Sequence, residues 1–167
     1  AFNALVPRAA RHEPVDYLVG HTPFFTMDLI VTRDVLIPRP STETLVEHVL
    51  QRARREPATS ALQIADVCTG SGAIAVTLAA ERGGLKLLAL DNSQDALDIA
   101  RENSRAHEVD GRIGFVLSDC LTRMPERFAG QLTAIVANPP YIGDQERAGM
   151  TRDVLGYEPS SALFPGE

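Results

Sequence analysis

The chain has 167 residues, of which 44% are hydrophobic and 23% charged, and its formal net charge is −6. This length suits one domain with a sizeable core, and the composition is ordinary for a globular protein. The negative charge argues against a broad phosphate-binding face, so we do not expect nucleic acid as a direct substrate. The sequence contains neither a secretory signal pattern nor an apolar run of the roughly 20 residues that span a bilayer, so we expect no membrane partner.

Cysteine and histidine usage limits the chemistry further. Cys68 and Cys120 are the only cysteines, too few for a disulfide framework, and they form no CxxC motif. The four histidines are scattered without ligand spacing, so we expect no metal site. A reducing, cytoplasmic setting is the expectation that follows. Because the chain starts at Ala1 and stops after ALFPGE, we also expect it to be a piece of a longer protein.

The first quarter of the chain predicts a linker with a β-hairpin. Residues 1–23 predict a short helix running into a turn. The stretch 24–37, FFTMDLIVTRDVLI, is rich in β-branched and aromatic residues and predicts a hairpin or two short strands around TRD. The sequence PRPST then breaks the pattern, and Ser41 or Thr42 can cap a helix over about 42–55. We expect 1–41 to form the linker and 42–167 the main domain.

From residue 62 short apolar strands alternate with helices. Strands are predicted at 62–67, 86–91, 112–119 and 132–137, and helices at 73–82 and 93–108. Strands that are apolar on both faces and joined by helices indicate a parallel sheet with right-handed crossovers. The predicted fold class is α/β, with a doubly wound, mostly parallel sheet after the hairpin. We expect the sheet to be truncated, its last strands following residue 167.

A glycine loop follows the first of these strands. In DVCTGSGAIA, residues 66–75, the glycines let the backbone turn tightly and approach a ligand, and the helix N-terminus offers free N–H groups. Asp91 ends the next strand, 19 positions after Gly72, where Rossmann-type folds place an acid on ribose hydroxyls. A plain turn would also explain the loop, and helix capping would explain Asp91, although Ser93 is available as a cap.

The loop departs from both common phosphate-binding patterns. It lacks the GKS or GKT sequence of P-loop nucleotidases, and Ala75 stands where the dinucleotide fingerprint has its third glycine. A nucleoside cofactor without a pyrophosphate therefore fits the pattern. S-adenosylmethionine, with a ribose, an adenine and an amino-acid tail, meets that description.

The fourth strand stops abruptly at VANPPYI, residues 136–142, because two adjacent prolines cannot continue a sheet ladder. In a doubly wound sheet the fourth strand lies beside the first, so Asn138 should face the glycine loop across the crevice where ligands bind. Residues that precede proline are held extended. The Asn138 side chain and the Pro139 carbonyl would then offer two acceptors to a planar –NH₂ group, on which Tyr141 could stack. A strand that simply ends in a proline turn would give the same sequence pattern.

This arrangement suits methyl transfer to an amide or aromatic amine nitrogen. Such a nitrogen is a poor nucleophile because its lone pair is delocalised, and two neutral acceptors would fix it in line with the methyl–sulfur bond. Positioning and desolvation would supply much of the catalysis. The methylated cation is strongly acidic, so a dedicated general base is not required.

The motifs resemble a known family when they are taken together. IPRPSTETLVEHVL, DVCTGSGAIA, LALDNSQDALDIARENS, SDC, VANPPYI and YEPSSAL follow in the order seen in class I methyltransferases that modify protein glutamine. The closest resemblance is to the release-factor glutamine methyltransferases (the HemK/PrmC family), from about Glu13 onward. It implies methyl transfer from S-adenosylmethionine to the side-chain amide nitrogen of the glutamine in the GGQ motif of a peptide-chain release factor, which would be the protein partner.

The resemblance also implies which residues form the site. The positions that match cofactor contacts are Cys68, Thr69, Gly70, Ser71, Gly72, Asp91, Asn92, Asp119, Cys120 and Asn138. The positions that match catalytic, substrate-holding contacts are Asn138, Pro139, Pro140 and Tyr141. Phe24 and the Pro38-Arg39-Pro40 turn match segments that line the same cleft.

Some positions depart from the family, and three further functions fit the sequence. Cys68 and Thr26 stand where the family usually has glycine, and Ser41 stands where it has glutamate. An adenine-N6 methyltransferase shares the NPPY logic, because the exocyclic amine of adenine is also planar and would be reached by base flipping. A ribosomal-protein glutamine methyltransferase would use the same chemistry on a different protein. A non-catalytic module that binds S-adenosylmethionine would need only the glycine loop and its surroundings.

Overall fold

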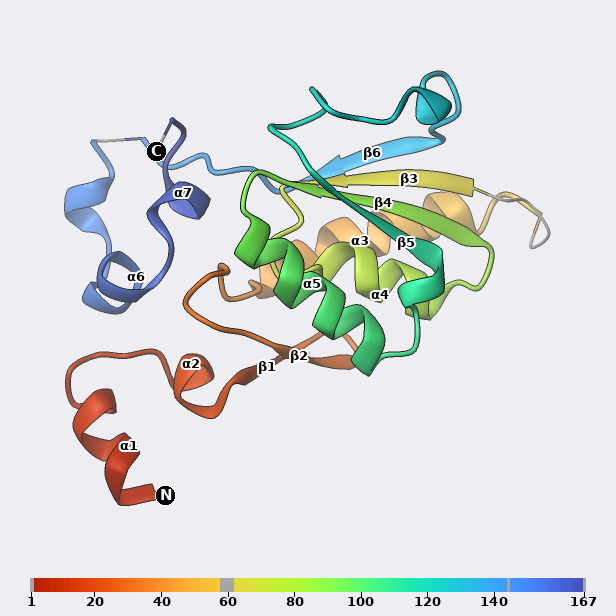
Figure 1. Ribbon diagram of the computed structural model, residues 1–167. Coiled ribbons are helices and arrows are strands. Elements are labelled where there is room, and N and C mark those ends of the chain that lie inside the picture. The colour runs from red at the N-terminus through yellow and green to blue at the C-terminus, as the bar shows by residue number, and fades with distance from the viewer. Residues whose placement is uncertain (1, 58–61, 144, 167) are drawn as a thin grey trace.

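A four-stranded parallel sheet forms the centre of the computed structural model, which describes residues 2–57, 62–143 and 145–166 (Figure 1). Its strand order is β5-β4-β3-β6. The strands are β3 (Leu62–Val67), β4 (Leu85–Asp91), β5 (Ile113–Leu117) and β6 (Ala134–Ala137). The predicted α/β class is confirmed, and the first strand of the sheet lies beside the fourth, as the doubly wound pattern requires.

The three longer helices near the sheet lie on one of its faces (Figure 1). They are α3 (Pro40–Ala53), α4 (Ala73–Glu81) and α5 (Gln94–Ala106). Right-handed crossovers put α4 and α5 on the same face, because β3, β4 and β5 are added in the same direction. The link from β5 to β6 runs in the opposite direction and contains a 3₁₀ turn, η2 (Glu126–Phe128). Its side chains pack on the other face of the sheet, among them Leu121, Met124, Phe128 and Leu132.

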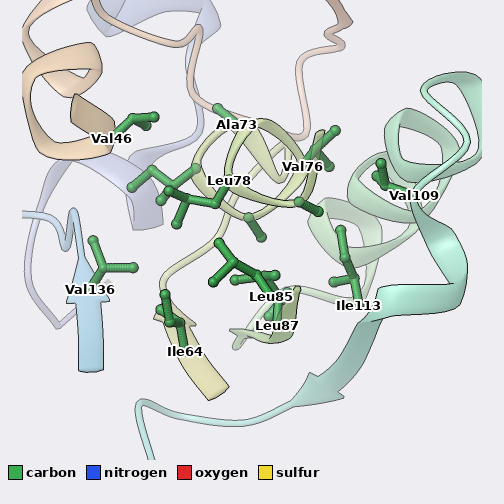
Figure 2. Packing of buried hydrophobic residues seen from close by; sticks show 14 of the residues in the cluster. Val46, Ile64, Ala73, Val76, Leu78, Leu85, Leu87, Val109, Ile113 and Val136 are labelled. Atoms are coloured by element: carbon green, nitrogen blue, oxygen red, sulfur yellow. The ribbon is translucent and has the colours of Figure 1, made fainter. Parts of the chain in front are cut away.

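The main core lies between the sheet and these helices. Residues 73–79 of α4 are all buried, and most are small, so the helix packs closely against its neighbours on every side. Figure 2 shows Leu78 of α4 pointing toward Ile64, Leu85 and Leu87 of the strands. The burial of β3 and β4 on both faces and of α4 all round explains why these segments are so uniformly apolar.

The N-terminal segment contains α1 (Phe2–Ala9), α2 (Val15–Val19) and a hairpin of β1 (His21–Phe24) and β2 (Met27–Ile30). The hairpin therefore lies earlier than the predicted stretch 24–37. Its two-residue turn begins at Phe25, which has a φ of +56°. The Phe25 N–H donates to Glu43 Oε1 at 2.8 Å, and this hydrogen bond holds Phe25 in that conformation. Asn103 of α5 holds the other end, bonding both the N–H and the carbonyl of Ile30.

Residues 31–37 form a turn and not the second strand that the composition predicts. The reason is local: the Asp34 N–H donates to the Thr32 hydroxyl at 3.2 Å, and the Val35 N–H donates to the Thr32 carbonyl. Side-chain bonds of this kind compete with a strand ladder. We call residues 31–39 the 31–39 loop.

Helix α3 begins at Pro40, two residues before the predicted start, so the expected capping by Ser41 or Thr42 is wrong. Proline suits the first helical position, because its missing N–H would have no helical partner there. The short element η1 (Asp110–Arg112) precedes β5, and η3 (Arg147–Gly149), α6 (Arg152–Tyr157) and α7 (Ser160–Leu163) follow β6. Among the residues that the structure describes, no helix is long and apolar enough to cross a membrane.

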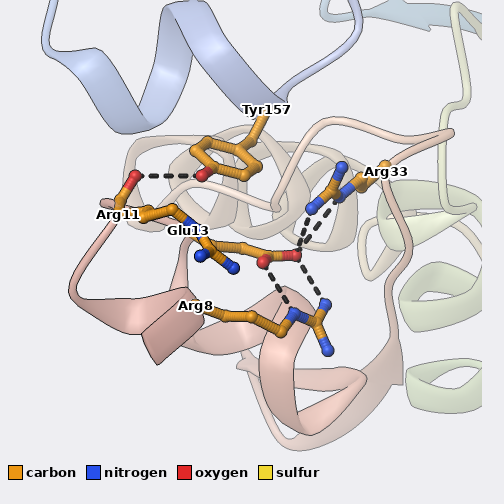
Figure 3. A network of polar contacts seen from close by, with 5 residues as sticks. All are labelled: Arg8, Arg11, Glu13, Arg33 and Tyr157. Carbon is orange, nitrogen blue, oxygen red and sulfur yellow. Dashed lines mark hydrogen bonds and ion pairs between the residues drawn. The ribbon is translucent and has the colours of Figure 1, made fainter. Parts of the chain in front are cut away.

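A network of contacts around the buried carboxylate of Glu13 links the N-terminal segment to Tyr157 near the other end of the chain (Figure 3). Glu13 accepts from Arg8 at 2.6 and 2.8 Å and from Arg33 at 2.5 and 3.2 Å. The Arg33 guanidinium also lies 4.9 Å from the centre of the Tyr157 ring, and the Tyr157 hydroxyl donates to the Arg11 carbonyl. Hydrogen bonds from Arg8 are the main cause that lowers the pKa of Glu13 to about 2, against the opposing effect of burial.

Replacing this carboxylate should give a pH-dependent loss of stability. We expect Glu13→Gln to lower the free energy of unfolding at pH 7 by about 2 kcal/mol, because charge-assisted hydrogen bonds are lost. Since the folded-state pKa lies below the ordinary value of 4.5, this contribution is complete above that pH and fades as the pH falls toward about 2. Urea unfolding of both proteins from pH 7 to pH 3 measures the difference. A difference that stays constant over this range would contradict the assignment.

Candidate active site

A cavity of about 350 Å³ lies at the carboxyl ends of the parallel strands. Its floor is built from the segments that follow β3, β4, β5 and β6. The volume falls within the range of small-molecule sites, and the location is the crevice where the strand order reverses. This is the position at which the sequence predicts that the glycine loop and NPPY meet.

All but two of the predicted site residues line this cavity. Those that do are Cys68, Thr69, Gly70, Ser71, Asp91, Asn92, Asp119, Cys120, Asn138, Pro139 and Pro140. Of the described residues predicted for the site, Gly72 and Tyr141 lie outside the cavity lining. Tyr141 is 73% exposed, and its stacking role stays a prediction. Pro38 and Arg39 of the expected cleft turn line the cavity, whereas Phe24 is buried in the main core.

Asp66 fixes the shape of the glycine loop from below. Its buried carboxylate accepts from the Thr69 hydroxyl at 2.6 Å and from the Ala75 N–H, at the start of α4, at 3.1 Å. Burial raises the pKa of Asp66 to about 7, against the lowering effect of these two hydrogen bonds. Gly72 serves packing, because a Cβ there would lie 3.0 Å from Ala100 Cβ of α5. The loop is thus held against both helices that follow it.

Asp91 joins the loop to the end of the neighbouring strand. Its Oδ2 accepts from the Gly70 N–H at 2.8 Å and its Oδ1 accepts from the Ser93 N–H at 3.0 Å. Ser93 caps α5 through the Ala96 N–H, as the sequence predicts. Asp91 is therefore free of the capping role, and its carboxylate faces the cavity at the place where a ribose is expected.

Asn138 is held between two other elements. It is half-buried, and its Nδ2 lies 3.4 Å from the Thr42 hydroxyl in the first turn of α3. Farther along the same segment, the Ile142 N–H donates to the Leu163 carbonyl at 3.2 Å. The stretch after β6 is thus tied to α3 on one side and to α7 on the other.

Two cavity walls are not predicted from the residues alone. One is the 31–39 loop, which the composition predicts as strand. The other is the segment 159–166, which contributes Pro159, Ser161, Ala162, Pro165 and Gly166. The ion pair of Arg39 with the buried Glu158, at 2.5 Å, joins the two walls. The family resemblance of IPRP and YEPSSAL is the signal that could have linked them, because nothing local connects residues 119 positions apart.

The charges of the lining fit S-adenosylmethionine. Asp34, Asp91 and Asp119 supply negative charge for a sulfonium and an ammonium group, and Arg39 is the one basic residue among the described residues that line the cavity. The carboxylate of the amino-acid tail of the cofactor would pair with the Arg39 guanidinium. The described part of the chain contains no group of three or more side chains that could hold a metal ion.

Cys68 has a backbone conformation that favours glycine, the residue that the resembling family usually has at this position. Its φ is +60°, in the left-handed region. Burial raises the pKa of its thiol to about 11, with a further contribution from the charge of Asp91, so the thiol stays protonated and is no nucleophile. Cys68 therefore has the left-handed conformation of the loop, and its thiol is not activated.

This strain predicts an order of stability for two variants. Cys68→Gly and Cys68→Ala both remove the thiol, but only glycine adopts this φ without steric cost. We expect the glycine variant to be more stable than the alanine variant by about 1 kcal/mol. Urea unfolding midpoints provide the measurement. Equal midpoints, or a more stable alanine variant, would show that the loop is unstrained.

Comparison with known proteins agrees with this geometry. Residues 40–160 match the methyltransferase small domain family. A release factor glutamine methyltransferase of Nitratidesulfovibrio vulgaris is 46% identical over 99% of this chain and 54% of its own length. Enzymes of the same name from Xylella fastidiosa and Bacillus anthracis are 44% and 36% identical, over 99% and 100% of this chain and 58% of their own lengths. The chain thus spans little more than half of these relatives.

Solved structures agree on the fold. The hMettl16 catalytic domain, in complex with MAT2A 3′UTR hairpin 6, superposes with a TM-score of 0.62 at 14% identity, over 98% of this chain and 67% of its own. A SAM-dependent methyltransferase from Agrobacterium tumefaciens gives 0.58 at 15% identity, over 74% of this chain and 40% of its own. The match over residues 40–160, the strand order and the cavity at the switch point lead to one conclusion: this chain belongs to the methyltransferase small domain family, and its cofactor is S-adenosylmethionine.

Proposed function

We propose that this protein methylates the side-chain amide nitrogen of the glutamine in the GGQ motif of a peptide-chain release factor. The observation that carries the proposal is the shared cavity, in which the glycine loop after β3 and Asn138 after β6 lie at neighbouring strand ends. The names of the relatives support a release factor as the protein partner. A cytoplasmic location agrees with such a partner and with the free thiols of Cys68 and Cys120.

The side chains of the cavity would bind the cofactor by charge and shape. Asp91 would accept from the ribose hydroxyls, and the acidic lining would favour the cationic sulfonium. The cofactor supplies an electrophilic methyl group. The Arg39 guanidinium would face the negatively charged end of the amino-acid tail.

Asn138 and Pro139 would hold the nucleophile. The Asn138 Oδ1 and the Pro139 carbonyl would accept one N–H each from the glutamine amide, which orients the nitrogen lone pair toward the methyl carbon. Bound S-adenosylmethionine would supply the methyl group to this nitrogen, with the electron pair of the C–S bond left on sulfur. The N-methylated amide cation then releases a proton to water. No charged base is needed at the nitrogen. Most of the rate enhancement would come from positioning of the reactants in a cavity that excludes water.

The acidic cavity argues against a polynucleotide substrate. Asp34, Asp91 and Asp119 line it with a single basic side chain, Arg39, among the described residues of the lining. A phosphate backbone that approached this lining would meet like charge. Adenine-N6 methylation shares the acceptor geometry, so duplex DNA is included among the substrates that are tested below.

Truncating the amide acceptor should lower turnover far more than it lowers cofactor affinity. We expect Asn138→Ala to lower kcat by about 100-fold, corresponding to about 3 kcal/mol of transition-state stabilisation, because one fixed polar group is lost. Transfer of a labelled methyl group from S-adenosylmethionine to a GGQ release factor gives the rate. Calorimetric titration with S-adenosylhomocysteine should show a much smaller loss, because Asn138 is one of several lining residues that match cofactor contacts.

A substrate panel decides which molecule is methylated. It contains the release factor, the same factor with the GGQ glutamine changed to alanine, a ribosomal protein and duplex DNA. Transfer to the unmodified factor alone supports the proposal. Labelling of DNA or of the ribosomal protein in its place would establish another substrate, and cofactor binding without any transfer would indicate a binding module.

A further inference from the structure

Two buried glutamates each form an ion pair with an arginine of the 31–39 loop. Glu13 pairs with Arg33, and Glu158 pairs with Arg39. The two glutamate side chains are 3% and 1% exposed, so both are enclosed by protein. Only the second pair reaches the cavity, because Arg39 belongs to its lining and Arg33 does not. The two pairs therefore resemble each other chemically and differ in location.

The Arg39–Glu158 pair connects the two cavity walls. On one side, Pro38 and Arg39 line the cavity from the 31–39 loop. On the other side, Pro159 follows Glu158 directly and begins the wall formed by 159–166. The hydrogen bond from the Arg39 guanidinium to Glu158 Oε1 joins the two segments. A shift of Glu158 would move both walls.

The hydrogen bonding of Glu158 does not suit a residue whose main role is to stabilise the fold. Its Oε2 has no hydrogen-bond partner among the described residues, and burial raises the pKa of its carboxyl although Arg39 opposes this. A buried ion pair with an unpartnered oxygen contributes little net stability compared with apolar packing. The more specific effect of the pair is on Arg39, whose long side chain loses its rotational freedom when it is bound to a buried carboxylate.

We propose that Glu158 is a positioning residue for cofactor binding: it fixes the Arg39 guanidinium in the cavity so that Arg39 can bind the carboxylate of the amino-acid tail. Arg39 is the one basic residue of the described lining, so its placement determines how well the cavity binds an anionic group. The inference rests on the cofactor site and not on the identity of the methylated protein.

The test compares ligands that differ in the tail. S-adenosylhomocysteine carries the carboxylate, whereas 5′-methylthioadenosine has the same nucleoside without the amino-acid end. We expect Glu158→Gln to weaken S-adenosylhomocysteine binding by about 10-fold, the loss expected for one charged hydrogen bond, and to change methylthioadenosine binding by less than about 2-fold. Isothermal titration calorimetry measures both affinities without requiring turnover.

Glu13→Gln is the matched control. It removes the same charge from a carboxylate that is also enclosed and holds the same loop through Arg33 (Figure 3), and neither Glu13 nor Arg33 lines the cavity. It should leave the affinities for both ligands within about 2-fold of the unmodified protein, even where its unfolding midpoint falls as far as that of Glu158→Gln. Glu158→Met, which keeps the volume, provides a second variant should the amide variant fail to fold.

The binding results separate the two proposals. Equal weakening of both ligands by Glu158→Gln, or equal effects of Glu158→Gln and Glu13→Gln, would overturn the positioning role while the methyltransferase proposal stands. Failure of the unmodified protein to bind either ligand would overturn the cofactor site itself. Selective loss of the carboxylate-bearing ligand in the Glu158 variants alone supports the inference.

Discussion

The parallel pairing of β3 with β6 is the constraint on which the site depends. Val67 is the residue opposite Ala137 at the end of this pair, so Cys68 and Asn138 are the first residues beyond it on each strand. Two turns that lie 70 residues apart in sequence are thereby brought to adjacent strand ends. A register slip by one residue would turn the buried Val136 of β6 toward the opposite face, so the burial of this residue also fixes the position of Asn138.

The parts of the site that can be predicted from the sequence are those set by local and periodic signals. Apolar runs locate the strands, glycines locate the loop, and Ser93 is recognisable as a cap because capping depends on neighbouring residues only. The sequence predicts strand at Phe25 and in the 31–39 loop, and this prediction is wrong because local side-chain contacts outweigh the average preference of the residue types. Aromatic and β-branched residues favour strands on average, but Thr32 and Asp34 close a turn through side-chain bonds, and Glu43 holds Phe25 in a conformation that its residue type disfavours.

The unpredicted parts of the site depend on contacts between distant residues. Glu158 and Arg39 show no periodic relation, and the short helices α6 and α7 bury too few residues to show an amphipathic pattern. Composition favours the surface for a glutamate, so nothing local marks Glu13 or Glu158 as buried. Only the order of the family motifs connects these positions before the structure does.

The cavity combines a floor and walls that are built differently. The floor rests on parallel strands and on α4, whose residues 73–79 are buried throughout, so almost any larger side chain there would disturb the core. The walls, in contrast, are short loops joined by polar side chains such as Arg39 and Glu158. Substitutions at the polar positions of these loops can therefore alter the outline of the entrance with little effect on the main core, whereas Val31, Val35 and Ile37 belong to a second buried cluster. In such a molecule the choice of substrate can diverge during evolution while the chemistry at the bottom of the pocket is conserved.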